Sequence, residues 1–198
     1  MTTISRRDAL KIVTGAPMAA ALVWTPVEAR RAHEQARQAE SSPKPFTPKF
    51  FKPAEYAMVG ILVDLIIPRD ERSGSATDAG VPQFMDFMMT DQPRRQVAMR
   101  GGLALIDRLA MSRFGKRLTG ASDAQRRQLL DEIAYTTNPD PGLSQATAFF
   151  SSFRDLTATG FWTTKIGIED LQYQGNVFVD EWNGCPAAAL AKLGVKYP

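Results

Sequence analysis

The chain has 198 residues, of which 44% are hydrophobic and 23% are charged, the balance of a folded protein rather than a disordered one. The formal net charge is only +3, and acidic residues stand between the arginine pairs at 30/31, 94/95 and 126/127, so no stripe for nucleic acid is predicted. A single cysteine, Cys185, and a single histidine, His33, exclude an intrachain disulfide, a Cys/His zinc site and covalent haem attachment.

The same two residues leave little room for catalysis. A Ser-His-Asp or Cys-His arrangement would have to use His33, which lies in a polar stretch after the N-terminal segment. Cys185 stands directly before Pro186 and is interpreted as a packed residue rather than a redox group. No phosphate-binding glycine loop or EF-hand spacing is present, although a metal site made of carboxylates alone stays open. We therefore expect no cofactor in this chain and no activity from it alone.

The first 29 residues are typical of an export signal. An apolar run from Ile12 to Trp24 is too short and too mild to span a bilayer, and Val27-Glu28-Ala29 has the small-x-small form of a cleavage site. The start resembles the twin-arginine pattern Ser-Arg-Arg-x-Phe-Leu-Lys, with Ala9 in place of the usual aromatic. The matching residues are Ser5, Arg6, Arg7, Leu10 and Lys11. Such a signal is read by the twin-arginine translocase and carries folded proteins; the alternative is an ordinary basic amphipathic helix.

Residues 30–53 are predicted to form a linker. The stretch 30–42 is polar throughout, and PKPFTPKFFKP from Pro43 to Pro53 is too rich in proline for a regular helix or a central strand. Phe46, Phe50 and Phe51 would each cost about 1.5–3 kcal/mol to leave in water. We expect these three rings to pack either on this domain or on a partner.

Residues 54–198 are predicted to form one all-α domain, an irregular bundle of about five to six helices. Pro53 opens the first helix and Pro68 stops it, while Pro82 opens a short second helix. Apolar residues recur at helical spacing in both. They are Met58, Ile61, Leu62, Leu65 and Ile66 in the first, and Phe84, Met85, Phe87 and Met88 in the second.

Three longer patterns follow. The third helix is predicted over 93–114, with Val97, Gly101, Leu105, Leu109 and Met111 or Ser112 inward, and its glycine pair suggests a close helix crossing. The fourth has Ser122 and Gln125 in a capping-box pattern and buries Leu129, Leu130 and Ile133. The fifth begins near Pro141 and carries aromatic residues to Phe161-Trp162.

The C-terminal region loses this periodicity after Ile166 and ends in a short helix that starts near Pro186. Its aromatic residues, Tyr173, Phe178 and Trp182, predict an extended tail that lies across a surface of this domain or of another chain.

The connection IIPRDERSGSATDAGVPQF, from Ile66 to Phe84, raises the main functional question, because polar and small residues separate two apolar helices there. Carboxylates at Asp64, Asp70, Glu71 and Asp78 could serve acid/base chemistry if their environments separated their pKa values. Arg69 and Arg72 flank the Asp70-Glu71 pair, which favours a solvated loop. We expect Asp78 to Pro82, with Gly80 in a tight turn, to be a shaped connection against the first helix and a partner.

These residues resemble a known family. The helix ending in Ile-Ile-Pro, the run Asp78-Ala79-Gly80-Val81-Pro82, Gln174-Gly175 and Trp182-Asn183-Gly184-Cys185-Pro186 look like the gluconate 2-dehydrogenase subunit 3 family, over about residues 56–193. The resemblance implies a non-catalytic small subunit beside a large FAD-containing sugar or sugar-acid dehydrogenase of the glucose-methanol-choline type. It also implies a periplasmic location, at the inner membrane if the signal is retained, electron transfer to a cytochrome c subunit or soluble cytochrome c, and export of the large subunit by the small one.

The candidate residues for a partner interface are Phe46, Phe50, Phe51, Asp78, Gly80, Val81, Pro82, Tyr173, Phe178, Trp182, Cys185 and Pro186. Two alternatives stay open: a transient periplasmic export chaperone or adaptor, and a free-standing helical enzyme that uses the carboxylates. No catalytic, cofactor or metal residue is predicted.

Overall fold

The computed structural model describes residues 46–134, 140–172 and 184–196, together with Val27 and residues 30–32 and 34–35. Regular structure in these ranges is helical, with no strand, as the sequence predicts. The α-helices are α3 (Pro53–Ile66), α4 (Val81–Asp91), α5 (Gln96–Phe114), α6 (Asp123–Ala134), α7 (Ser144–Trp162), α8 (Lys165–Asp170) and α9 (Ala187–Leu193). Single 3-10 turns lie at Pro93–Arg95, Leu118–Gly120 and Pro141–Leu143.

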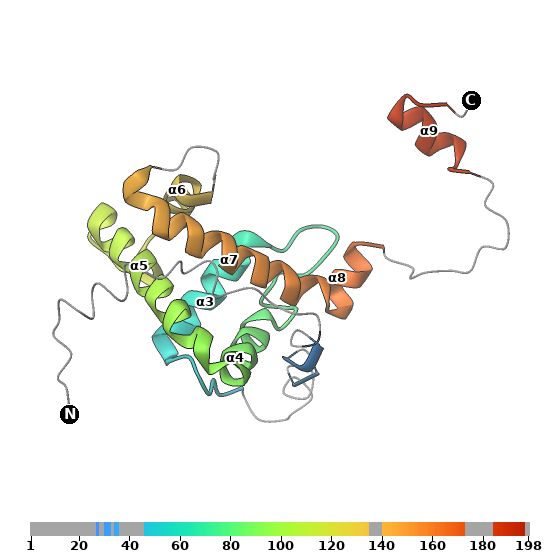
Figure 1. Cartoon of the computed structure of the whole chain (residues 1–198). Coiled ribbons are helices and arrows are strands. Elements are labelled where there is room, and N and C mark those ends of the chain that lie inside the picture. The colour runs from blue at the N-terminus through green and yellow to red at the C-terminus, as the bar shows by residue number, and fades with distance from the viewer. Residues whose placement is uncertain are drawn as a thin grey trace.

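Helix α7 is the centre of the bundle. It packs against α3, α4, α5 and α6, and Figure 1 shows it running across the molecule with α8 at its end. Its buried face carries Phe149, Phe153, Leu156 and Phe161, all at most 1% exposed. These large side chains fill the space between the surrounding helices, so α7 supplies much of the core.

The predicted helix boundaries are confirmed where proline or a cap marks them. Pro53 is the first residue of α3, and α3 ends at Ile66, just before Pro68. Before α6, the Ser122 amide donates to Gln125 Oε1 at 3.0 Å and the Gln125 amide donates to Ser122 Oγ at 3.3 Å, which is a complete capping box. The predicted core residues of α6, Leu129, Leu130 and Ile133, are buried.

The predicted inward face of α5 is only partly right: Leu105 and Leu109 are partly buried against the core, but the other predicted positions are not. Val97 is 77% exposed, Met111 is 46% exposed, and Gly101 also faces solvent. The buried residues are instead Ala98, Met99, Gly102, Leu103, Ile106 and Ala110. The physical reason is the close contact with α7: a Cβ at Gly102 would lie 1.9 Å from Cδ2 of Phe149, so only glycine lets the two helices approach this closely.

Helix α8 was not predicted, because the apolar period stops at Ile166. The structure forms it by a local cap: Thr164 Oγ1 accepts a hydrogen bond from the Gly167 amide at 3.0 Å. None of the helices in the described ranges is long and apolar enough to cross a membrane.

Candidate functional site

Residues 46–52 form a strap across α3, α4 and α5. Phe50 and Phe51 are 7% and 4% exposed, and Phe46 packs its ring against Tyr56 and Phe87 with ring centroids 5.8 and 5.7 Å apart. Of the two surfaces allowed for these rings, the structure places them on this domain. The prediction that Phe50 and Phe51 face a partner is therefore corrected, because their rings are already covered within the chain, while Phe46 is partly buried there.

A buried carboxylate holds the strap in place. Asp86 of α4 is fully buried and accepts backbone hydrogen bonds from three consecutive residues, Lys49 at 2.8 Å and Phe50 and Phe51 at 3.0 Å each. Hydrogen bonds to an ionised acceptor are the stronger kind, and a buried charge is tolerated only when its oxygens are bonded. Asp86 thus gives the strap, which has no helix or sheet of its own, its backbone partners.

Arg100 of α5 closes the other side of the strap. Its guanidinium donates to the Phe50 carbonyl at 2.7 Å and lies 4.6 Å from the centre of the Phe50 ring, a cation–π geometry. Asp86 and Arg100 are residues that sequence reasoning missed. The available signal was an acidic residue at the centre of the apolar run FMDFMM, where a carboxylate must find several donors.

The connection between α3 and α4 is an internally bonded unit. The Ser75 amide donates to Asp78 Oδ2 at 2.6 Å and the Asp78 amide donates to Ser75 Oγ at 3.3 Å, so a capping box starts the turn that precedes α4. The Thr77 amide donates to Asp64 Oδ1 of α3 at 2.7 Å. The loop is therefore fastened to α3, which confirms one half of its predicted role as a shaped connection.

The loop carboxylates have pKa values that suit charge, not proton donation. The Ser75 amide, followed by the Ser75 hydroxyl and Arg69, lowers the pKa of Asp78 below its usual value, and the Arg69 guanidinium lies 2.7 Å from Asp78 Oδ2. The amides of Ser73 and Arg72 likewise lower the pKa of Asp70. A general acid at neutral pH needs a raised pKa, so neither carboxylate fits the carboxylate-enzyme alternative.

The segment Gly80 to Pro82 lies in the interior. Gly80 precedes α4 with φ of 76°, in the left-handed region that favours glycine, which confirms the predicted tight turn. Val81 is fully buried and Pro82 is buried, so they face this chain's own core rather than a partner. Only Asp78 of the DAGVP motif is exposed, and it is already paired with Arg69.

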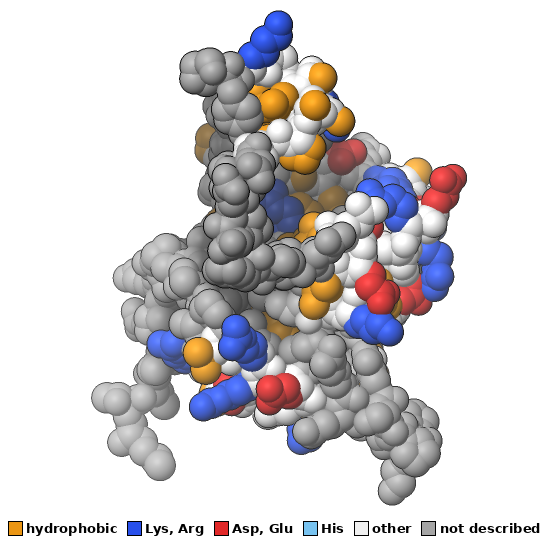
Figure 2. Space-filling model, turned by 90° about the vertical axis from the view of Figure 1, so that its right-hand side faces the viewer, with side chains coloured by type: hydrophobic (Ala, Val, Ile, Leu, Met, Phe, Trp, Pro, Cys, Tyr) orange, Lys and Arg blue, Asp and Glu red, His pale blue; other side chains and the backbone are white. Residues whose placement is uncertain are grey.

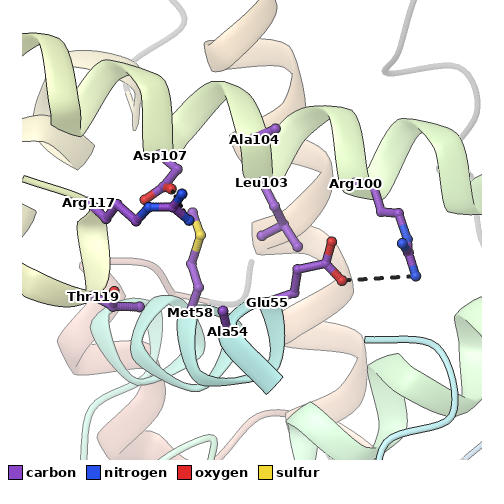
Figure 3. Close-up of a pocket in the computed structure, with 9 residues that line it drawn as sticks. All are labelled: Ala54, Glu55, Met58, Arg100, Leu103, Ala104, Asp107, Arg117 and Thr119. Atoms are coloured by element: carbon purple, nitrogen blue, oxygen red, sulfur yellow. Dashed lines mark ion pairs between the residues drawn. The ribbon is translucent and has the colours of Figure 1, made fainter. Parts of the chain in front are cut away.

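A small pocket of about 180 Å³ lies where α3, α5 and the 3-10 turn at Leu118–Gly120 meet (Figure 3). Its floor is apolar, from Met58 and Leu103, and its charged residues already have partners. Glu55 and Arg100 lie 4.0 Å apart, and Arg117 lies 3.6 Å from Asp107. Small-molecule sites usually enclose roughly 300–1,000 Å³, so this pocket does not fit a dinucleotide cofactor such as FAD.

The remaining predicted site residues lie at the two ends of the chain. Cys185 and Pro186 are exposed, which contradicts the prediction that Cys185 is packed within this chain. The signal residues Ser5, Arg6, Arg7, Leu10 and Lys11 and the tail aromatics Tyr173, Phe178 and Trp182 lie outside the described residues. In the described part of the chain, no group of three or more His, Cys, Asp or Glu could hold a metal ion.

These features define an all-α protein in which several of the described carboxylates bind backbone amides of its own loops. The family model for gluconate 2-dehydrogenase subunit 3 matches residues 53–181, well over half of the chain, so the chain belongs to that family. The match starts at the first residue of α3 and ends before Trp182-Asn183-Gly184-Cys185-Pro186, so α9 lies beyond it. No curated protein and no solved structure matches the chain.

Proposed function

We propose that this protein is the non-catalytic small subunit of a periplasmic FAD-dependent dehydrogenase that oxidises an alcohol group of a sugar, glycoside or sugar acid. The family match over residues 53–181 carries the proposal, because the family is one subunit of a dehydrogenase built from several. The large partner subunit holds the FAD and the substrate, and a cytochrome c subunit or soluble cytochrome c takes the electrons. The small subunit stabilises the large one and accompanies it through the twin-arginine translocase.

The way this chain uses its polar groups supports that division of labour. Asp86, Asp64 and Asp78 each accept backbone amides, and the described pocket is too small for a dinucleotide. These three carboxylates therefore position the chain's own backbone, as expected of a subunit that offers a shape to a partner. The twin-arginine pattern at Ser5-Arg6-Arg7 supports export of an already folded complex.

The test is to purify the full chain from its native host and to identify the protein that elutes with it. We expect a yellow complex with a flavin absorption spectrum that reduces a dye acceptor in the presence of a sugar or sugar acid, and a single peak on size exclusion. A large subunit that is exported and active in a strain lacking this chain would refute the proposed role. A chain that separates from its client after export would indicate a transient chaperone instead.

A second measurement isolates the export function. Replacing Arg6 and Arg7 by two lysines keeps the charge of the N-terminus but removes the twin-arginine pattern that its receptor reads. We expect both subunits to stay in the cytoplasm of that variant strain. If the large subunit still reaches the periplasm, it has another route and the proposed export role is wrong.

A further inference from the structure

Among the described residues, most of the exposed large apolar side chains lie in the C-terminal part of the sequence. Of the large apolar side chains that are exposed in the described ranges, four lie between residues 168 and 195: Ile168 at 38%, Leu171 at 55%, Leu193 at 71% and Val195 at 51%. Figure 2 looks at the end of the molecule that carries α8 and α9, and orange side chains cluster on α9 at the top of that view. Clustered exposed apolar side chains, as on α9, mark interaction sites more often than scattered ones do.

Helix α9 has the local signals of a helix but no core to rest on. Pro186 precedes it, and Gly194, with φ of 65°, ends it in a turn in which the Val195 amide donates to the Leu190 carbonyl at 3.2 Å. None of its residues is buried, and Figure 1 shows it apart from the other helices. Isolated helices shorter than about 12–15 residues are marginal in water. A seven-residue helix therefore needs a surface to cover its leucines.

We propose that α9 and Val195 insert into an apolar groove of the partner dehydrogenase subunit, and that Leu171, the residue after α8, also contacts that subunit; this inference rests on the proposed function. Leu190, Leu193 and Val195 are the anchors, in the manner of helix-in-groove recognition. The groove belongs to another kind of subunit because the chain's family is one component of a larger enzyme. The docking helix lies beyond the region that the family model matches, which ends at residue 181.

Charge specifies the rim of that groove. Residues 184–196 include Lys192 and Lys196 and no acidic residue. Lys192 lies in the last turn of α9, where a cation also suits the negative end of the helix dipole. The groove on the partner is therefore expected to be apolar along its floor and to carry carboxylates where the C-terminal end of α9 comes to rest.

The test uses the intact complex, purified through a tag on the large subunit that elutes with the wild-type chain. Leu193→Asp combined with Val195→Asp places two charges at the last residue of α9 and just beyond it. Val97→Asp combined with Met111→Asp places the same charges on exposed positions of α5 as a matched control. Because all four side chains are exposed in the free chain, both variants should keep its helical circular dichroism and melting temperature. We expect the α9 variant to bind the large subunit at least tenfold more weakly and the α5 variant to bind normally.

Hydrogen exchange distinguishes the possible coverings of α9. The amides of Leu190 to Val195 should exchange at least tenfold more slowly in the complex than in the free chain, and Leu171→Asp should weaken the complex less than the α9 variant does. A complex unaffected by the α9 charges overturns the inference, as does equal protection in the free chain or protection that grows with the concentration of the free chain. The last two results would place α9 on its own body or on a second copy.

The two proposals fail in different arms of this experiment. If the wild-type chain elutes with no flavoprotein, the proposed function is wrong and the inference falls with it. If the wild-type complex forms and only the variant arms give the contrary result, the proposed function stands and α9 is not its docking element.

Discussion

The packing of α5 against α7 can be tested by adding a single methyl group at Gly102. A Cβ at this position would lie 1.9, 2.1 and 2.3 Å from three ring atoms of Phe149 on α7, where contacts of 3.4–4 Å are ordinary. The ring cannot move aside cheaply, because Phe149 is 1% exposed and its ring is 5.8 Å from that of Phe153. Gly102→Ala must therefore push α5 away from α7 or force the ring into a strained position.

The magnitude follows from two opposing effects. Alanine is favoured over glycine inside a helix by about 1 kcal/mol, whereas overpacking a core costs about 1–3 kcal/mol and occasionally more. A contact this short belongs at the upper end of that range, so the net loss for Gly102→Ala is about 2 kcal/mol in the free energy of unfolding. For a chain of this size that lowers the melting temperature by about 4–8 °C.

Gly60→Ala in α3 is the matched control. A Cβ at Gly60 would meet nothing within 4 Å, so only the helix preference acts and the variant should gain about 1 kcal/mol. Urea denaturation followed by circular dichroism measures both variants. Introducing Gly102→Ala into a Phe149→Leu background should cost less than in the wild type, with a coupling of about 1 kcal/mol or more. If Gly102→Ala is as stable as Gly60→Ala, the close α5–α7 crossing is wrong.

Four further changes test the strap and the loop. Asp86→Ala leaves three backbone amides without their acceptor and should cost about 3 kcal/mol or more, seen as faster amide exchange of residues 49–51 and earlier proteolysis there; unchanged exchange would contradict the role of Asp86. Gly80→Val places a β-branched residue at φ of 76° and should destabilise the chain by about 2 kcal/mol or more and impair assembly with the large subunit, and a normally assembled, active complex would argue against it. Asp78 has a lowered pKa in the folded chain, so its contribution to the free energy of unfolding is complete above its ordinary pKa of 3.8 and is lost as the pH falls through the lower folded pKa. Asp78→Asn should therefore flatten the acid side of a stability–pH curve, and an unchanged acid side would refute this. Burial, and after it the charge of Asp86, raises the pKa of Tyr56 from 10.0 to about 12, so the stability of the fold should fall as the pH rises from about 10 to about 12. Tyr56→Phe should reduce this loss of stability and remove one late-titrating phenol from an ultraviolet titration. A titration curve that loses an ordinary phenol instead would show the assignment to be wrong.

Several parts of the fold could be predicted because their signals are local. Proline at the start of α3 and α4, the Ser122/Gln125 capping box and the glycine before α4 act on backbone groups within a few residues, and each stands where the sequence predicts. The apolar spacing of α6 was also sufficient, since the helix is polar on its other faces and has only one side to bury.

The candidate site was less predictable, because its parts come from distant positions. Asp86 binds residues 49–51, which lie 35 to 37 positions earlier in the sequence. No local pattern indicates which amides a buried carboxylate will accept. The phenylalanines of the strap could satisfy the same hydrophobic requirement on this chain or on a partner. Only the position of α4 beside the strap decides between them.

By itself the sequence determined the all-α class and the limits of the helices that proline or a cap marks, because these depend on neighbouring residues. The tertiary structure decided which face of α5 is buried, since apolar residues lie on more than one side of that helix and the contact between Gly102 and Phe149 selects one of them. It also decided that Val81, Pro82 and the strap phenylalanines face the core while α9 does not. Burial depends on which surfaces meet in space, and a linear pattern of apolar residues specifies that a surface must be covered without specifying what covers it.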